Sequence, residues 1–331
     1  MDLENRIRLL VELGQFMQSG DAAWTTAKTR AFQHNPWFLP DFIDLALRNI
    51  ADSFLQQDLL EKWIRDYNFP PQNPAPKKVG IVMAGNIPLV GFHDFLCCFL
   101  SGHSPFLKLS SKDTSLFPVI LEFLKAKNPA IESMVQVSPM LRGLDAYIAT
   151  GSNNSARYFE YYFGKYPSLI RHNRTSIGLL DGNETTDELV KLADDVFLFF
   201  GLGCRSVTQV LVPEQYDFIP LLQAFRKYHW MAEHNKYKNN YDYRLSLAIL
   251  NKQHYMSNEC LLLMENASPF SPISVLHYSF YRDWASAMQT KEKHDLQCVV
   301  GRNYEQFGNS QCPKLGDYAD GEDTMLFLQG L

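Results

Sequence analysis

The sequence predicts an α/β protein built on a parallel sheet. After residue 78, short runs that are apolar on both faces alternate with stretches of helical periodicity. Strands of this kind, joined by helices, are typical of a parallel sheet that is covered on both faces. The length, 331 residues, is enough for about two domains with sizeable cores.

The chain opens with a helical layer. Apolar residues recur at helical spacing over residues 2–19, and two further helical segments are expected at 40–55 and 57–68. Residues 69–78, FPPQNPAPKK, contain four prolines, which exclude a helix and indicate a short rigid connector. A first domain boundary is therefore expected there.

Strand-like and helix-like segments then alternate as far as residue 212. The expected strands are VGIVMA, PFLKLS, SMVQVS, AYIATG, SLIRH, SIGLLD and TQVLV. The expected helices cover residues 89–101, 114–125, a stretch after Ser152, 186–199 and 215–228. The last apolar stretch, TMLFL, is expected to form a terminal strand.

Composition excludes several classes of function. A net charge of −5 and a pI near 6.0 leave no basic footprint for nucleic acid. The six cysteines show neither C-x-x-C pairs nor regular spacing, and the histidines are irregularly spaced, so no metal site is expected and a reducing cytoplasm is the expected compartment. The N-terminus is charged, and the longest apolar stretch, residues 196–204, is well short of the roughly 18 residues of a membrane helix. A soluble protein is expected.

Polar residues and glycines follow three of the expected strands. Ligands of parallel sheets bind outside the carboxyl ends of the strands, so these residues are candidates for a binding site. Each also has an ordinary structural explanation, as a turn residue, a surface lysine or a helix cap. The usual signatures G-x-G-x-x-G, Walker A, H-E-x-x-H and G-x-S-x-G are missing. The candidates are Gly85-Asn86, Lys108-Leu109-Ser110 and Thr150-Gly151-Ser152.

A cysteine in a glycine turn is the main candidate for chemistry. In VFLFFGLGCRSVTQVLV, residues 196–212, Gly201 and Gly203 precede Cys204. Glycine permits a turn that presents a thiol to a substrate, and the strand that follows would hold the turn in place. The alternative is that Cys204 is a small buried hydrophobe, as cysteines often are.

In this order, the features resemble the aldehyde dehydrogenase superfamily. The resemblance implies that Asn86 donates to an oxyanion and that Lys108 binds the adenosine ribose of a cofactor. It places Gly151 and Ser152 at the start of a helix beneath the cofactor phosphates. The nucleophilic cysteine of the superfamily falls on Cys204.

Two segments are most similar to the fatty acyl-CoA reductases that supply aldehyde for bacterial bioluminescence, and to shorter relatives of them. These are GNIPLVGFHDFLCCFLSGHSPFLKLSSKD and FGNSQCPKLGDYADGEDT. The resemblance covers residues 78–212 and the C-terminal tail, and it does not extend to the N-terminal helices. It implies a cytoplasmic enzyme that forms a thioester on Cys204 from acyl-CoA and reduces it to a fatty aldehyde with NADPH, with NADH as the alternative.

The resemblance also implies an aldehyde-dehydrogenase-like division of the chain. We expect an N-terminal helical segment at 1–76, a nucleotide-binding domain at 77–180 and a second α/β catalytic domain at 181–331. Gly85, Ser110 and Thr150 are expected to complete the cofactor site. An exposed terminal strand can pair with another subunit, so a homodimer is expected.

Two departures from the superfamily pattern bear on the reaction. Residues 171–174, Arg-His-Asn-Arg, replace the E-L-G-G turn whose glutamate activates water, and this favours reduction over hydrolytic aldehyde oxidation. Residues 305–308 match either the E-x-F-G that holds the nicotinamide ribose or the final segment of the family; the second is preferred, so Glu305 is left out of the site. Two alternatives remain: an acyltransferase acting through Cys204, and a binding module without catalysis.

Overall fold

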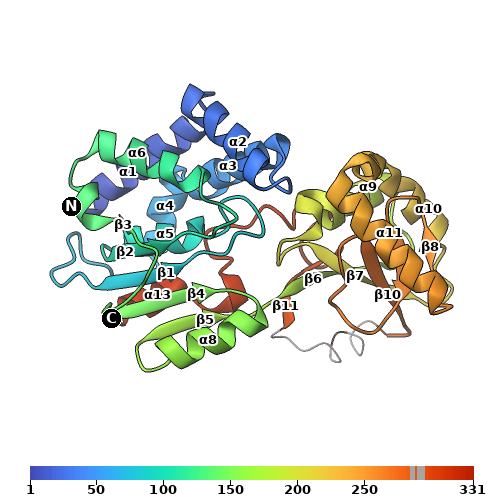
Figure 1. Ribbon diagram of the computed structural model, residues 1–331. Coiled ribbons are helices and arrows are strands. Elements are labelled where there is room, and N and C mark those ends of the chain that lie inside the picture. Colours follow the sequence, from blue (N-terminus) through green and yellow to red (C-terminus); the bar gives the residue numbers. More distant parts are fainter. Residues whose placement is uncertain (284–287, 289–294) are drawn as a thin grey trace. The chain divides into compact units, whose positions relative to one another are not determined.

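The computed structural model describes residues 1–283, 288 and 295–331, and it contains two units (Figure 1). Unit 1 comprises Met1–Asn173 and Pro313–Leu331, and unit 2 comprises Arg174–Cys312. Unit 2 is therefore inserted into the chain of unit 1. Each unit contains a sheet that is parallel or almost parallel, which confirms the predicted α/β class.

Unit 1 contains a five-stranded parallel sheet in the order β3-β2-β1-β4-β5. This order arises because the chain moves from β1 outward to β3 and then returns across the sheet to β4. Right-handed crossovers then place the connections before and after the return on opposite faces. The strands are β1 (Lys78–Val82), β2 (Ser104–Lys108), β3 (Gln136–Val137), β4 (Ala146–Thr150) and β5 (Ser168–Arg171).

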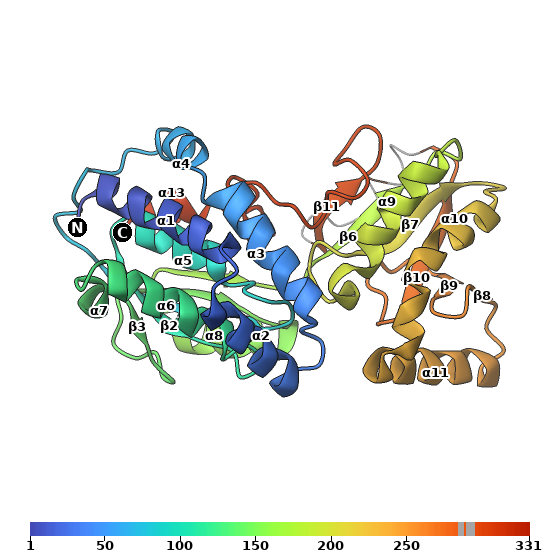
Figure 2. The ribbon, with the colours of Figure 1, turned by 90° about the horizontal axis from the view of Figure 1, so that it is seen from above.

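Helices cover both faces of this sheet. In the view from above, α1, α3 and α6 lie across the sheet, whereas α8 lies beneath it (Figures 1 and 2). Asp2, a favoured N-cap residue, caps α1: its carboxylate accepts from the Asn5 N–H. The helices are α1 (Leu3–Gln18), α2 (Ala22–His34), α3 (Pro40–Phe54), α4 (Gln57–Ile64), α5 (Phe92–Leu100), α6 (Leu116–Lys127), α7 (Ile131–Met134), α8 (Asn153–Phe163) and α13 (Thr324–Gln329), with a short 3₁₀ turn η4 (Ala319–Gly321) before α13.

The N-terminal helices share one core with the sheet. Leu10 of α1, Ile81 of β1, Phe95 of α5 and Met325 of α13 are fully buried in the same hydrophobic cluster. The expected separate segment 1–76 is thus part of unit 1. The second boundary falls at Asn173 and Arg174 instead of residue 180, and the tail after Cys312 belongs to unit 1.

The prediction of a terminal strand is wrong, because TMLFL lies in helix α13. The Asp323 carboxylate caps this helix by accepting from the Leu326 N–H at 2.8 Å. Met325 and Leu328, three positions apart, are buried against the core of unit 1, and α13 packs on α5. The strand pairing from which a homodimer was expected therefore does not exist, and the homodimer stays a prediction.

The described residues of unit 2 form a six-stranded sheet in the order β11-β6-β7-β10-β9-β8, and of these strands only β8 is antiparallel to its neighbour. Strand β7 confirms the expected strand after Cys204. The strands are β6 (Thr175–Leu179), β7 (Val207–Pro213), β8 (Met256–Ser257), β9 (Leu262–Glu265), β10 (Val275–Tyr281) and β11 (Leu296–Val300). The described helices are α9 (Thr186–Phe197), α10 (Phe218–Ala224) and α11 (Asn235–Leu250), with 3₁₀ segments η1 (Leu198–Gly201) and η2 (Phe225–Glu233). Among the residues that the structure describes, no helix has the length and apolar character needed to cross a membrane.

A buried ion pair connects three distant segments of unit 1. The Arg171 Nη1 at the end of β5 donates to both carboxylate oxygens of Asp94 on α5 at 2.6 Å, and its Nη2 donates to the Thr324 hydroxyl at 2.7 Å. Arg171 and Asp94 are only 3% and 5% exposed. The pair therefore fixes the positions of β5, α5 and α13 within the unit.

Replacing Asp94 by Ala leaves the buried guanidinium without its counter-charge. We expect the variant to lose about 3–5 kcal/mol in the free energy of unfolding, measured by urea denaturation. The control is Asp242→Ala, which breaks the exposed pair between Lys238 and Asp242 on α11 and should cost at most about 0.5 kcal/mol. Equal losses in the two variants would contradict the role given to the buried pair.

Candidate active site

The residues predicted to bind the cofactor lie along one edge of the unit 1 sheet. Strands β2, β1 and β4 are parallel neighbours, and Val82 is in register with Lys108 and with Ala149. The segments that follow these three strands therefore leave the sheet at the same edge. The structure brings together here Gly85-Asn86, Lys108, Ser110 and Thr150-Gly151-Ser152.

Gly85 lets two of these segments meet. A Cβ atom at this position would lie 2.4 Å from the Oγ and 2.6 Å from the Cβ of Ser110, distances that real side chains do not adopt. The Ser110 Oγ in turn accepts from the Lys112 N–H at 3.2 Å, which closes the turn after β2. Gly85 and Ser110 are thus packing partners at the sheet edge.

The turn that carries Asn86 contains a residue in the left-handed region. Leu89 has a φ of 55°, a conformation that is costly for a residue with a branched side chain. The Leu89 N–H donates to the Asp113 carboxylate at 2.9 Å, and burial raises the pKa of Asp113 to about 6. Asp113 therefore holds the turn, and sequence reasoning missed it because no local pattern links it to the turn 24 residues earlier.

The segment after β4 starts helix α8, as the sequence predicts. The Ser152 hydroxyl caps the helix by accepting from the Ser155 N–H at 3.3 Å. A Cβ at Gly151 would lie 2.8 Å from the Ser155 Cβ and 2.9 Å from the Phe159 ring, so glycine permits this close packing. The buried Thr150 hydroxyl has no hydrogen-bond partner in the part of the chain that the structure describes. The first-turn N–H groups and the helix dipole suit this end of α8 to an anion.

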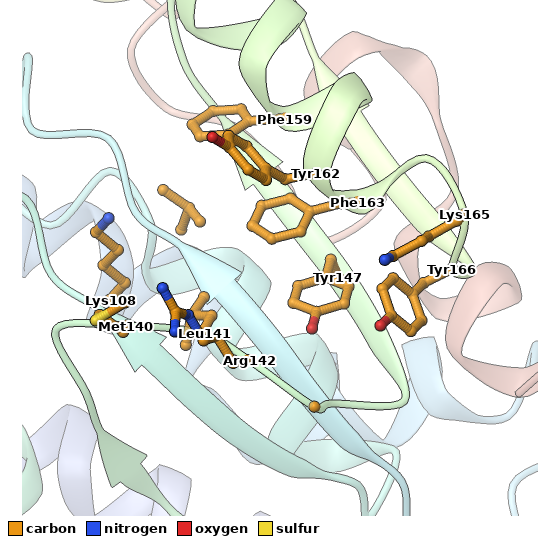
Figure 3. Close-up of a pocket in the computed structure, with 12 residues that line it drawn as sticks. Lys108, Met140, Leu141, Arg142, Tyr147, Phe159, Tyr162, Phe163, Lys165 and Tyr166 are labelled. Atoms are coloured by element: carbon orange, nitrogen blue, oxygen red, sulfur yellow. The ribbon is translucent and has the colours of Figure 1, made fainter.

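A cavity of about 420 Å³ opens beside Lys108, between α8, β4 and the loop at 138–145 (Figure 3). Its wall is aromatic: the rings of Tyr147 and Phe163 stack in parallel with centroids 4.1 Å apart. Arg142 and Lys165 also line it. Sequence reasoning did not find this cavity, because Tyr147 and Phe163 come from different elements and resemble ordinary core residues.

In unit 2, helix α9 ends in strained backbone before the cysteine. It begins with a capping box between Thr185 and Glu188. It was expected to reach residue 199, but it stops at Phe197, and Phe199 and Phe200 have φ values of 55° and 57°. Non-glycine residues in this region cost free energy and persist only where the surrounding structure imposes them. The Phe200 ring packs on His234 at 4.6 Å between ring centroids, which contributes to that constraint.

Hydrogen bonds hold the backbone on both sides of Cys204. The Ser176 hydroxyl donates to the Cys204 carbonyl at 3.0 Å, and the Ser206 Oγ accepts from the Gly203 N–H at 3.2 Å. Cys204 itself is only partly buried. Cys204 therefore lies in a hydrogen-bonded turn directly before β7. That this turn presents the thiol to a substrate stays a prediction.

The loop at 305–311 packs against the cysteine turn. The buried Asp195 carboxylate accepts from the N–H groups of Gly308 at 2.7 Å and Ser310 at 2.9 Å. Gln311 donates to the Ser206 hydroxyl at 3.3 Å. Partly buried Glu305 lies at the start of this loop, beside the end of β11. Glu305 is therefore a candidate that the sequence analysis left out, although the E-x-F-G pattern contained its signal.

The turn at 171–174 provides no carboxylate, as expected. Arg171 is committed to Asp94, and the side chain of His172 is half-exposed and lies 3.5 Å from Glu160. Arg174 begins unit 2 and donates to the Leu296 carbonyl at 3.1 Å. Arg171 thus has a structural role in unit 1.

Cys298 is partly buried, as Cys204 is, but its thiol donates to the Ser176 hydroxyl at 3.1 Å and burial raises its pKa. The remaining cysteines differ from Cys204 in their exposure. Cys97, Cys98 and Cys260 are buried, and burial raises the pKa of all three thiols. Cys312 as a whole residue is exposed, but neighbouring atoms shield its sulfur in part from water, and this desolvation raises the pKa of the thiol. Within the described residues, no group of three or more histidines, cysteines or carboxylates is placed to hold a metal.

No protein-family model and no curated protein matches this chain. Solved structures do match. Aldehyde dehydrogenase 21 from Physcomitrella patens, in complex with the reaction product succinate, gives a TM-score of 0.66 at 13% identity over 91% of this chain and 74% of that chain. Succinic semialdehyde dehydrogenase from Streptococcus pyogenes, in complex with NADP+, gives 0.64 at 13% identity over 90% and 76%. A mutant of the propionaldehyde dehydrogenase from the Clostridium phytofermentans fucose utilisation microcompartment gives 0.61 at 8% identity over 91% and 78%.

The chain therefore has the fold of the aldehyde dehydrogenase superfamily, which confirms the predicted fold. The finer resemblance to the bioluminescence reductases is not tested by these matches and stays a prediction.

The buried carboxylate of Asp195 makes stability depend on pH. Burial raises its pKa to about 6, above the value of about 3.9 in an unfolded chain. Between about pH 4 and pH 6 the folded state therefore binds more protons, and this contribution to stability is lost as the pH rises. Asp195→Asn cannot titrate, so the stability of the wild type relative to this variant should fall from pH 4 to pH 6 in urea denaturation.

Asp187→Asn is the control, because it removes an exposed carboxyl from the same helix and reports the effect of charge alone. A stability difference that moves in favour of the wild type between pH 4 and pH 6 would contradict the raised pKa.

Proposed function

We propose that this protein is an acyl-CoA reductase that forms a thioester on Cys204 and reduces it to an aldehyde with NADPH. The observation that carries the proposal is the Cys204 turn. Strained backbone at Phe199 and Phe200 precedes it, hydrogen bonds to Ser176 and Ser206 hold it, and Cys204 is only partly buried. A partly exposed cysteine in a hydrogen-bonded turn on this fold is suited to nucleophilic catalysis.

The Cys204 thiolate attacks the thioester carbonyl of acyl-CoA. Its sulfur forms a bond to the carbonyl carbon, the bond from that carbon to the sulfur of CoA breaks, and CoA leaves as its thiolate. The Asn86 amide donates to the oxyanion that develops during the attack, the role that the resemblance gives it. The turn at 171–174 has no carboxylate to activate water, which favours reduction of the acyl group on Cys204 over its hydrolysis.

The residues of unit 1 fit a nicotinamide dinucleotide. The aromatic cavity beside Lys108 suits its adenosine, and the capped start of α8, after Gly151, suits its diphosphate. When bound, the reduced nicotinamide supplies the hydride that converts the Cys204 thioester to an aldehyde. When the aldehyde is released, the bond between its carbon and the Cys204 sulfur breaks. Cys204 leaves as thiolate and is ready for another cycle.

Glu305 is assigned to the nicotinamide ribose. The support is the position of the loop at 305–311, which hydrogen bonds to Ser206 and Asp195 beside the cysteine turn. This position favours the E-x-F-G alignment over the one preferred from sequence.

The first test is acylation of Cys204. Purified protein mixed with an acyl-CoA and no cofactor should gain the mass of one acyl group, seen by intact mass spectrometry, and Cys204→Ala should gain none. Cys312→Ala is the matched control because it removes an exposed thiol from the same unit, and it should still be acylated. An adduct that persists in Cys204→Ala would contradict the proposal.

The fate of the adduct separates the alternatives. Aldehyde that appears after addition of NADPH supports the reductase. An adduct that is stable to NADPH and NADH, but is transferred to an added amine, supports the acyltransferase. Failure of both short and long acyl-CoA to form an adduct supports the binding module.

Asn86→Ala tests the oxyanion contact. We expect the kcat for aldehyde formation to fall by about 10²–10³-fold, because a donor to the developing oxyanion is lost. The KM for NADPH should change little. A kcat close to that of the wild type would remove Asn86 from the mechanism.

A further inference from the structure

The cavity of unit 1 has its positive charge at two separate ends (Figure 3). Lys108 and Arg142 lie at one end, the stacked rings of Tyr147 and Phe163 lie in the middle, and Lys165 lies beside Tyr166 at the other end. The Lys165 Nζ is 5.4 Å from the centroid of the Tyr166 ring. The two ends therefore offer different surroundings to a bound anion.

The described residues that line the cavity include no carboxylate that balances these charges. All three cations line the cavity, and no aspartate or glutamate is among its described lining residues. Arg142 makes no hydrogen bond or ion pair with the part of the chain that the structure describes, and it lies on the exposed loop between β3 and β4. The nearby Asp145 is occupied, since its carboxylate accepts from the Lys78 N–H at 2.7 Å. The guanidinium of Arg142 is therefore available for a ligand.

The aromatic wall suits a flat ring. Tyr147 is buried against Phe163 and Tyr166, whereas Phe163 is only partly buried and Tyr162 is 60% exposed, so Phe163 and Tyr162 offer aromatic surface to a ligand. A purine can stack on such a surface, and a cavity of about 420 Å³ is in the range of small-ligand sites. With the base on this wall, we assign the ribose to the end of the cavity that carries Lys108 and Arg142, in keeping with the role that the resemblance gives to Lys108.

We propose that Arg142 binds a phosphate group on the ribose of an adenine nucleotide and so selects ligands that carry one. This inference rests on the proposed function, in which the cavity takes the adenosine end of the cofactor. The planar fork of arginine binds phosphate oxygens through two parallel hydrogen bonds. Sheets of this type recognise an unmodified ribose through a carboxylate and a phosphorylated one through an arginine, and this cavity offers only the latter.

Two ligands of the proposed reaction carry this chemistry. NADPH has a phosphate on the 2′ position of its adenosine ribose, and CoA has one on the 3′ position. The probes are therefore adenosine 2′,5′-bisphosphate, adenosine 3′,5′-bisphosphate and adenosine 5′-monophosphate, titrated into the full chain by calorimetry.

We expect the wild type to bind one of the bisphosphates more tightly than the monophosphate. Arg142→Gln should weaken the affinity for that bisphosphate by about 10- to 100-fold, the loss typical of charge-assisted hydrogen bonds. The affinity for the monophosphate should stay within about 3-fold of the wild-type value. Lys165→Gln is the matched control: it removes the same charge from the other end of the cavity and should weaken all three probes equally or not at all. Preference for the 2′-phosphate assigns the site to NADPH, and preference for the 3′-phosphate assigns it to CoA.

Three results would overturn the inference: no preference for a bisphosphate in the wild type, an equal loss for all probes in Arg142→Gln, or the selective loss in Lys165→Gln instead. Acylation of Cys204 is measured without cofactor. If Cys204 is acylated and aldehyde forms, but Arg142→Gln binds the three probes as the wild type does, this inference is refuted and the proposed function stands.

Discussion

The buried ion pair in which the Arg171 Nη1 donates to both carboxylate oxygens of Asp94 is the interaction on which the arrangement of unit 1 depends. Two charges removed from water are costly to bury, and the cost is offset only by close geometry and further hydrogen bonds. Arg171 meets both conditions through the carboxylate of Asp94 and the hydroxyl of Thr324. Asp94 lies in the first turn of α5, which directly follows the turn of Asn86 and Leu89. The same pair that holds the C-terminal helix therefore also fixes the element that supports the proposed oxyanion donor.

Each unit also places strained backbone near a buried carboxylate that accepts from main-chain N–H groups. Asp113 holds left-handed Leu89 in unit 1. In unit 2, Asp195 is on the helix that leads into left-handed Phe199 and Phe200, and it anchors the loop after Glu305. Left-handed residues of this kind each cost about 1–3 kcal/mol. Asp113 thus holds the turn of Leu89, and Asp195 holds the loop at 305–311, so that the proposed reaction would need little reorganisation of either segment.

Sequence patterns predicted local features well. Strands β1, β2, β4 and β7 lie where apolar runs were expected, because a strand that is buried on both faces has a local signature. The glycine and polar residues after β1, β2 and β4 lie at one edge because these three strands are parallel neighbours. The terminal strand was wrong because a short apolar run such as TMLFL fits a strand or a helix, and the Asp323 cap and burial against α5 decide between them. Asp113, Asp195 and the cavity with Arg142 depend on contacts between distant segments, which no local pattern encodes.

The insertion of unit 2 into unit 1 has a consequence for the order of synthesis. Unit 2 is one continuous segment, so all of its strands are available once Cys312 has been made. Unit 1 is not complete until residues 313–331 follow, since Tyr318 accepts from the Trp63 indole at 3.1 Å and Thr324 accepts from Arg171. During translation, the core of the first 173 residues thus lacks the side chains of residues 313–331, while the unit that carries Cys204 can already fold. A nascent chain halted after residue 312 would hold Cys204 in its finished turn before the core of unit 1 was complete.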